Sequence, residues 1–271
     1  MNEIKEGKES EESSRALLRY FDMTRFVLLK SLSICSISPK FNFLLDEVPR
    51  HELSDVADVV QKLLLIFRAD FDKILESGDD VSRDPEIKRA EFLLSRCKLL
   101  CLEPTYSSFL LVSAFLNNLI LSDGENIECF QILYITEFCL LVLYRRLFWK
   151  IFNSKDSYVN LQKFCEQFQK SFTLDSTLSD LGKTTVGENW INSVQRSVDT
   201  TDNLNFSLED FEVNSFEDDY SATNHMECVM EYSREIESIL FPCKSEIETF
   251  CETCKSKCHN YLSYGSQFYN S

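Results

Sequence analysis

Residues 104–152 read PTYSSFLLVSAFLNNLILSDGENIECFQILYITEFCLLVLYRRLFWKIF, the densest run of large apolar side chains in the chain. A polar interruption at Ser122, Asp123 and Gly124 divides this run into two apolar halves. Asp and Gly favour turns, because Asp bonds to nearby backbone and Gly adopts positive φ at little cost. The pattern therefore predicts a hairpin of two helices, and apolar side chains around most of each helix predict that the hairpin is buried.

A membrane-associated protein that uses residues 107–151 is an alternative interpretation of this run. A spanning helix needs ~20 mostly apolar residues. Glu128 and Arg145 enclose only residues 129–144, and Glu137 lies among them, where an unpaired carboxylate is costly in lipid. We therefore expect the second helix to lie in a protein core, with Arg145 and Arg146 at its rim or paired with Glu137.

Composition narrows the class of fold and of partner. The 271 residues include only 6 glycines and 5 prolines, which argues against an all-β protein and against a glycine-rich nucleotide-binding fold. The formal net charge is −16. Because contacts to phosphates dominate nucleic-acid affinity, this charge argues against direct nucleic-acid binding and against an anionic membrane surface.

The chain has 11 cysteines, whose oxidation state depends on the compartment. Residues 1–12 are polar and charged and do not resemble a secretory signal, so we expect a nuclear or cytoplasmic protein with reduced thiols. Within apolar helical patterns a free cysteine acts as a small hydrophobe. Six cysteines fit that description: Cys35, Cys97, Cys101, Cys129, Cys139 and Cys165.

Helical periodicity extends to both sides of the hairpin. Apolar residues recur at three- and four-residue steps over residues 53–75, and Asp84, Pro85 and Glu86 form a helix-start signal. We expect further helices from about residue 13 to 35, over 154–172 and over 190–198, with a loop at 173–188. The prediction is an all-α fold, a multi-helix bundle over residues 13–198 that buries the central hairpin.

Three further segments complete the predicted domain organisation. Residues 1–12 have no apolar face and are expected to be a disordered acidic arm. Residues 199–224 form an acidic linker that contains a candidate partner motif. Residues 225–271 are expected to form a C-terminal pair of helices, divided at Pro242.

The C-terminal cysteines give the pattern closest to a metal site. Cys251, Cys254, Cys258 and His259 follow one another at spacings seen in zinc sites. On one straight helix, however, Cys251 and Cys258 lie ~10 Å apart along the axis, whereas two thiolates on one zinc lie within ~4 Å. We therefore expect a core seam and no metal; if zinc binds, its ligands are Cys251, Cys254 and His259.

No residue pattern predicts catalysis or a cofactor. His51 and His225 have no patterned Cys, Asp or Ser neighbour, and neither a Walker loop nor a G-x-G-x-x-G motif occurs. The sequence therefore predicts no catalytic and no cofactor-binding residue. An enzyme whose site is assembled only by the fold stays an open alternative.

The acidic segment around residues 202–220 is the candidate partner-binding motif. Phe206, Phe211 and Phe216 are interspersed with acids and amides, a composition typical of segments that fold onto a partner. The spacing of apolar residues suggests a strand more than a helix. Alternatively, the segment is a linker whose phenylalanines pack back on the bundle. Ser207 and Ser215 each have an acid three residues later, which suits an acid-directed kinase.

These observations favour a non-catalytic function. We expect a helical adaptor or scaffold subunit of a nuclear or cytoplasmic complex, whose partners are other protein subunits. A zinc-dependent interaction module, an enzyme and a membrane-associated helical protein are the alternatives.

Overall fold

The predicted hairpin lies at the centre of the structure, a computed structural model that describes residues 16, 19–30, 50–76, 86–124, 131–154, 156–172, 176–200 and 206–214. Within these ranges the backbone is helical or irregular, with no strand, which confirms the predicted all-α bundle. A helix over residues 19–30 precedes α3 (Arg50–Glu76), α4 (Glu86–Leu100), α5 (Tyr106–Gly124), α6 (Gln131–Leu143), the π-helix η2 (Tyr144–Phe148), α7 (Trp149–Phe152), α8 (Ser157–Ser171), α9 (Leu178–Leu181) and α10 (Thr185–Asp199).

Helix α5 begins where the sequence offers a cap and is then buried along its whole apolar run. The Thr105 hydroxyl accepts from the backbone N–H of Ser108 at 3.2 Å, and the Thr105 N–H donates to Ser108 Oγ at 2.9 Å. This reciprocal pair satisfies two donors at the helix start. Every residue from 108 to 120 is buried, as is every residue from 132 to 144.

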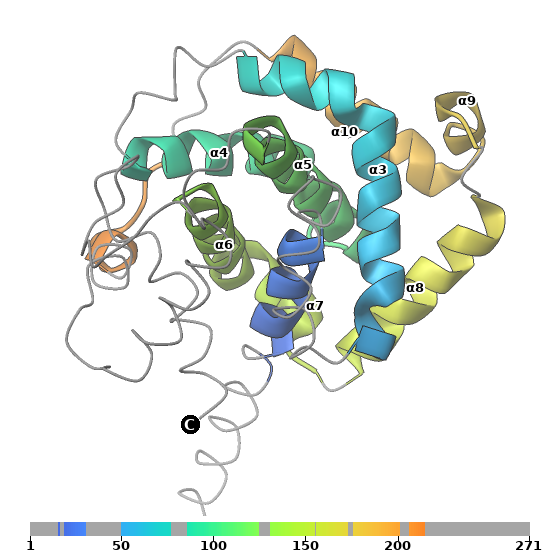
Figure 1. Cartoon of the computed structure of the whole chain (residues 1–271), viewed down its shortest axis with the longest axis horizontal. Coiled ribbons are helices and arrows are strands. Elements are labelled where there is room, and N and C mark those ends of the chain that lie inside the picture. The colour runs from blue at the N-terminus through green and yellow to red at the C-terminus, as the bar shows by residue number, and fades with distance from the viewer. Residues whose placement is uncertain are drawn as a thin grey trace, which may run out of the picture.

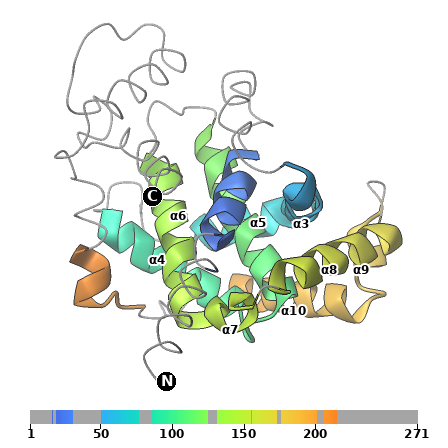
Figure 2. The same cartoon turned by 90° about the horizontal axis from the view of Figure 1, so that it is seen from below.

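Neighbouring helices cover the hairpin on several sides (Figure 1). Helix α3 packs along α5, α8 and α10, whereas α4 packs against α5, α6 and α10. In Figure 2, α8, α9 and α10 lie on the same side of the molecule, next to α3 and α5. The apolar surface around most of α5 and α6 is therefore covered by protein.

A cluster of aromatic rings fixes the end of the hairpin. Phe152 of α7 lies 5.0 Å from Phe109, 5.3 Å from Tyr20 and 5.6 Å from Tyr158, measured between ring centroids. Phe148 meets Phe109 edge to face at 5.6 Å. Such contacts add to the free energy of burial, so η2 and α7 are anchored on the core.

The second half of the hairpin departs from the single long helix that the sequence predicts. The N–H of Trp149 donates to the carbonyl of Tyr144, five residues earlier, as in a π-helix. Residues at steps of four drift by about 40° per step around a straight α-helix, and the wider turn absorbs this drift. It keeps four such residues on the core: Leu140, Tyr144, Phe148 and Phe152.

Residues 176–188, expected to be a loop, contain α9 and the start of α10. Thr177 and Asp180 form a capping box around the single turn of α9, and Thr184 Oγ1 accepts from the N–H of Gly187 at the start of α10. The Trp190 indole N–H then donates to the carbonyl of Ser107 at 2.8 Å. The helix start therefore lies about five residues before the predicted one, and Trp190 fastens α10 to α5.

Candidate functional site

A short segment that follows α10 in the sequence makes several polar contacts with α4 and η2. Residues 206–209 are irregular and residues 210–214 form one helical turn, drawn in orange beside α4 (Figures 1 and 2). We call residues 206–214 the docked segment. The strand suggested by its apolar spacing is not formed, because the N–H groups of Glu212 and Val213 bond to the carbonyl of Glu209.

An ion pair between Arg146 and Glu212 holds the docked segment. Arg146 Nε donates to Glu212 Oε1 at 3.0 Å, and Nη2 donates to Glu212 Oε2. Glu212 is only 1% exposed. Because a buried carboxylate without a partner is strongly unfavourable, the position of Glu212 depends on Arg146.

The same guanidinium also binds the segment's backbone and an aromatic ring. Arg146 Nη1 and Nη2 each donate to the carbonyl of Ser207 at 3.2 Å. The guanidinium carbon lies 4.7 Å from the centre of the Phe206 ring. Such a bidentate, stacked arrangement needs the planar fork of arginine and would not be reproduced by lysine.

Apolar and polar contacts to α4 complete the docking. Leu208 is buried within the core cluster, and Phe206 and Val213 pack against it. The Leu208 N–H donates to Glu91 Oε1 of α4 at 3.1 Å. Glu212 Oε2 accepts a further bond from the Glu209 N–H at 2.9 Å, so its carboxylate is satisfied by donors on two elements.

Helix α4 also anchors the end of α10, from which the docked segment continues. The buried Arg96 donates from Nη1 to the carbonyl of Thr200 at 3.1 Å, and its guanidinium lies 5.1 Å from the Phe92 ring centre. Glu91 and Arg96 are ~7.5 Å apart along the helix axis. Helix α4 therefore holds both Thr200, at the end of α10, and Leu208 of the docked segment.

An exposed aromatic and basic surface lies beside this ion pair. Arg145 lies with its guanidinium carbon 5.9 Å from the ring centre of Phe211, which is 53% exposed. Trp149 is 45% exposed, and Lys150 Nζ lies 6.0 Å from the centre of its ring. These are two exposed pairs, Arg145 with Phe211 and Lys150 with Trp149, and Arg145 and Trp149 are four positions apart in consecutive helical segments. We call the four residues the aromatic–basic surface; they come from η2, α7 and the docked segment.

The three candidate partner-binding phenylalanines have different surroundings. Phe206 is half-buried under Arg146, and Phe211 is exposed beside Arg145. Phe216 lies outside the described residues. The alternative interpretation, in which the segment packs back on the bundle, matches Phe206 and Leu208.

Sequence reasoning missed the residues that hold the docked segment. Arg146 was expected at the rim or paired with Glu137, whereas it pairs with Glu212, 66 positions later. Glu91 gave no signal beyond that of an ordinary acid on a helix. The sequence gives only an indirect hint of this pairing: the chain contains both an arginine doublet, Arg145 and Arg146, and a distant segment rich in acids and phenylalanine.

Two further predictions concern a zinc site and a membrane-spanning helix. Cys251, Cys254, Cys258 and His259 lie outside the described residues. Within the described ranges, no three His, Cys, Asp or Glu side chains gather closely enough to hold a metal ion. Among the helices described, none is both long and apolar enough to cross a membrane.

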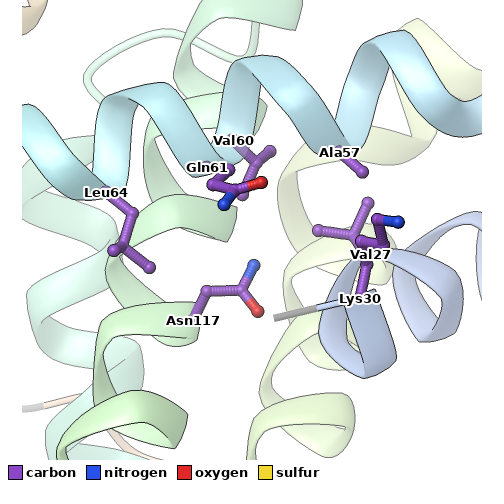
Figure 3. A pocket seen from close by; sticks show the side chains of 7 residues that line it. All are labelled: Val27, Lys30, Ala57, Val60, Gln61, Leu64 and Asn117. Carbon is purple, nitrogen blue, oxygen red and sulfur yellow. The ribbon is translucent and has the colours of Figure 1, made fainter. Parts of the chain in front are cut away.

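A small pocket lies between the helix over residues 19–30, α3 and α5 (Figure 3). It holds about 240 Å³ of empty space, including the open space at its mouth. The cavity volume open to the centre of a water-sized sphere is only about 10 Å³, room for about one water molecule, so the pocket is too small for an organic cofactor. Its lining mixes apolar and polar side chains: Val27, Lys30, Ala57, Val60, Gln61, Leu64 and Asn117.

The four described cysteines lie in the core as free thiols: Cys97, Cys101, Cys139 and Cys165. Burial raises the pKa of Cys165 to about 12, and it raises the pKa of Cys139 further. Burial also raises the pKa of Cys97 and of Cys101. A thiol with a raised pKa is a poor nucleophile at neutral pH, so these four act as packing residues.

Comparison with known proteins identifies no relative of this chain. The chain matches no protein-family model, no curated protein and no solved structure.

Proposed function

We propose that this protein is a non-catalytic helical adaptor or scaffold subunit of a nuclear or cytoplasmic complex and that it binds a partner protein through the aromatic–basic surface. The observation that carries the proposal is the joint exposure of Trp149 and Phe211 beside Arg145 and Lys150. Trp and Arg are enriched among the residues that dominate binding energy at protein interfaces.

The supports of this surface favour binding without large rearrangement. Phe148 and Phe152 anchor η2 and α7 in the aromatic core, and Glu212 holds the helical turn that carries Phe211. A surface that is already ordered loses little conformational entropy on association. The proposal therefore assigns recognition to Trp149 and Phe211 and assigns Phe206 to their support.

The charge of the surface indicates the chemistry of the partner. The whole chain carries a formal net charge of −16, whereas this surface carries Arg145 and Lys150 on neighbouring turns. A partner that offers an apolar side chain flanked by carboxylates matches it, and complementary charge favours encounter and register. The proposed partners are proteins and not nucleic acid, whose phosphates the net charge repels.

Replacing Trp149 and Phe211 together by Ala tests the proposal. Both side chains are exposed, so we expect unchanged helicity and melting temperature but at least a tenfold loss of co-purifying partner. A matched control replaces Leu65 and Val159, which are 57% and 48% exposed on α3 and α8. The proposal is wrong if the control and the test variant retain the same partners in the same amounts.

The phenylalanines of the acidic segment provide a second comparison. Phe206→Ala should lower the melting temperature, because its ring supports Arg146 and packs on the core. Phe211→Ala should leave the melting temperature unchanged and weaken partner binding. Phe216→Ala belongs in the same series as the third candidate partner residue.

A further inference from the structure

We propose that Ser207 is a phosphorylation site for an acid-directed protein kinase and that the phosphate releases the docked segment from Arg146. This inference rests on the proposed function, because release would remove Phe211 from the aromatic–basic surface. It concerns the regulation of that surface, and its structural part is testable without any partner.

The sequence around Ser207 has the charge pattern that such a kinase recognises. Glu209 and Asp210 follow Ser207 at the second and third positions, and kinases select substrates partly by charge patterns of this kind. Within the part of the chain that the structure describes, Ser122, Thr177 and Thr185 also have an acid three residues later, whereas Ser215 lies outside it. Ser207 differs from these three in its backbone conformation and in the contacts of its hydroxyl.

The hydroxyl of Ser207 is exposed and contributes little to the fold. Among the described residues, its Oγ makes one contact, 3.4 Å from the carbonyl of the adjacent Leu208, which is long for an O–H···O bond. Thr177 instead donates to Asp180 at 2.9 Å, and Ser122 lies in the last turn of α5 with its hydroxyl toward Asp72. Thr185 lies in the first turn of α10. Ser207 alone of the four combines irregular backbone with a hydroxyl directed at no other side chain.

The modification is an ordinary phosphoryl transfer from a nucleoside triphosphate. Ser207 Oγ forms a bond to the γ-phosphorus, the bond from that phosphorus to the β–γ bridging oxygen breaks, and the nucleoside diphosphate leaves. The hydroxyl proton passes to the catalytic carboxylate of the kinase. The product carries about −1.5 to −2 charges at neutral pH.

Charges already present around Ser207 make the docked form a poor place for that phosphate. Arg146 pairs with Glu212, its Nη2 also lies 3.9 Å from Glu209 Oε1, and Arg145 lies over the Phe211 ring. Glu91 of α4 accepts from the N–H of Leu208, next to Ser207, and Asp210 is a further acid of the docked segment. A phosphate at Ser207 has two choices. It takes donors of Arg146 from Glu212 and leaves a buried carboxylate unpaired, or it stays close to the carboxylates of Glu209 and Glu212 while Arg146 remains bound to Glu212.

Both choices raise the free energy of the docked form, whereas the released segment holds its phosphate in water. The equilibrium therefore shifts towards release. Released segments are also the better kinase substrates, because Arg146 binds the Ser207 carbonyl only in the docked form. Phosphorylation thus traps the segment after it has opened.

Amide hydrogen exchange on the full chain tests the release directly. Phosphoserine is incorporated at position 207 during synthesis, and exchange is compared with the unmodified chain. We expect the N–H groups of Leu208, Glu209, Glu212 and Val213 to exchange at least about tenfold faster, with α5 unchanged. Unchanged or slower exchange in this segment, for example because Arg145 binds the phosphate, overturns the release.

Two variants calibrate that measurement. Arg146→Gln removes the charge that holds Glu212 and should speed exchange of the same four amides without any phosphate. Ser207→Ala removes only the hydroxyl and should leave their exchange unchanged. If Ser207→Ala speeds exchange as much as phosphoserine does, the hydroxyl itself supports docking and the charge argument is wrong.

The kinase arm uses the wild-type chain, an acid-directed kinase and ATP, with sites located by mass spectrometry. We expect phosphate on Ser207 in preference to Ser122, Thr177 and Thr185. No phosphate on Ser207 overturns its assignment as a site. Unchanged partner binding by the Trp149 and Phe211 variant overturns only the proposed function, so the two failures are distinguishable.

Discussion

At the residue scale, Gly187 is a position where a single added methyl group would collide with backbone. A Cβ on Gly187 would lie 2.0 Å from the carbonyl oxygen of Leu181 and 2.6 Å from its Cγ. Backbone cannot move aside as a flexible side chain can. The first turn of α10 therefore packs directly on α9, and only Gly permits this approach.

Gly187→Ala should therefore destabilise the protein, by about 1–3 kcal/mol, in the range of overpacking substitutions. Gly182→Ala is the matched control. The nearest atoms to its added Cβ lie at 3.4–3.7 Å, and its φ of −63° suits any residue. The control should be neutral or slightly stabilising. Equal midpoints of urea denaturation for the two variants would contradict this account.

The buried thiols allow a second prediction at the same scale. Because burial raises the pKa values of Cys97, Cys101, Cys139 and Cys165, almost no thiolate is present at pH 7 to attack an alkylating reagent. We expect these four to resist iodoacetamide in the native protein and to react fully in denaturant. Mass spectrometry of the alkylated peptides measures both states. Rapid native alkylation of Cys139 would show that the core opens on the time scale of labelling.

At the scale of the element, the single turn of α9 depends on its capping box. The ammonium group of Lys183 and the backbone and hydroxyl of Thr177 hold the pKa of Asp180 well below its usual range. A lowered pKa stabilises the folded state above the ordinary pKa of aspartate, ~3.9, and this contribution declines as the pH falls below that value.

Asp180→Asn keeps the shape of the side chain and removes the titrating charge. We expect the wild type to melt at a higher temperature than Asp180→Asn at pH 6, and the gap to narrow below about pH 4. Calorimetry measures both melting temperatures across this pH range. The other carboxylates titrate in both proteins, so their contribution drops out of the difference. A gap that stays constant with pH would show that the charge of Asp180 does not contribute.

Among these variants, truncation of a buried side chain in the central hairpin should destabilise the protein most. Leu133 of α6 is fully buried, and truncation of such a side chain leaves a cavity. Leu133→Ala should cost ~2–5 kcal/mol in the free energy of unfolding. Leu65→Ala, at an exposed position of α3, should change it by less than ~0.5 kcal/mol. Chemical denaturation of the two variants compares them directly.

At the scale of the whole molecule, the sequence predicted what depends on local pattern. The apolar run over residues 104–152 is continuous enough to indicate a buried hairpin, and α4 begins at Glu86, directly after the predicted Asp84 and Pro85 signal. Thr105, Ser107 and Ser108 are all residue types that cap helices, and only the structure identifies Thr105 and Ser108 as the pair that does so. In these places the local preference and the tertiary packing agree.

The features that the sequence did not predict depend on tertiary contacts. The π-helical turn keeps Phe148 and Phe152 on the aromatic core, and nothing in the sequence of residues 144–148 marks it. The pairing of Arg146 with Glu212 selects one carboxylate among 44 acidic residues, and no local signal marks it. The single turn of α9 was hidden in a segment whose Ser, Thr, Asp and Gly content is typical of loops.

The packing of the whole molecule predicts that the protein does not insert its hairpin into a membrane. Lipid contact would require apolar helix faces that are open to the outside, yet every residue at 108–120 and 132–144 is buried by neighbouring helices. Among the described residues, the exposed large apolar side chains outside the aromatic–basic surface include Leu65 on α3, Val159 on α8 and Leu178 on α9, each on a different helix. We therefore expect the chain to be released from membrane fractions by alkaline carbonate and to remain in the supernatant without detergent. Retention of the wild-type chain in the carbonate-washed pellet, together with solubilisation by mild detergent, would show that the hairpin leaves this arrangement and enters lipid.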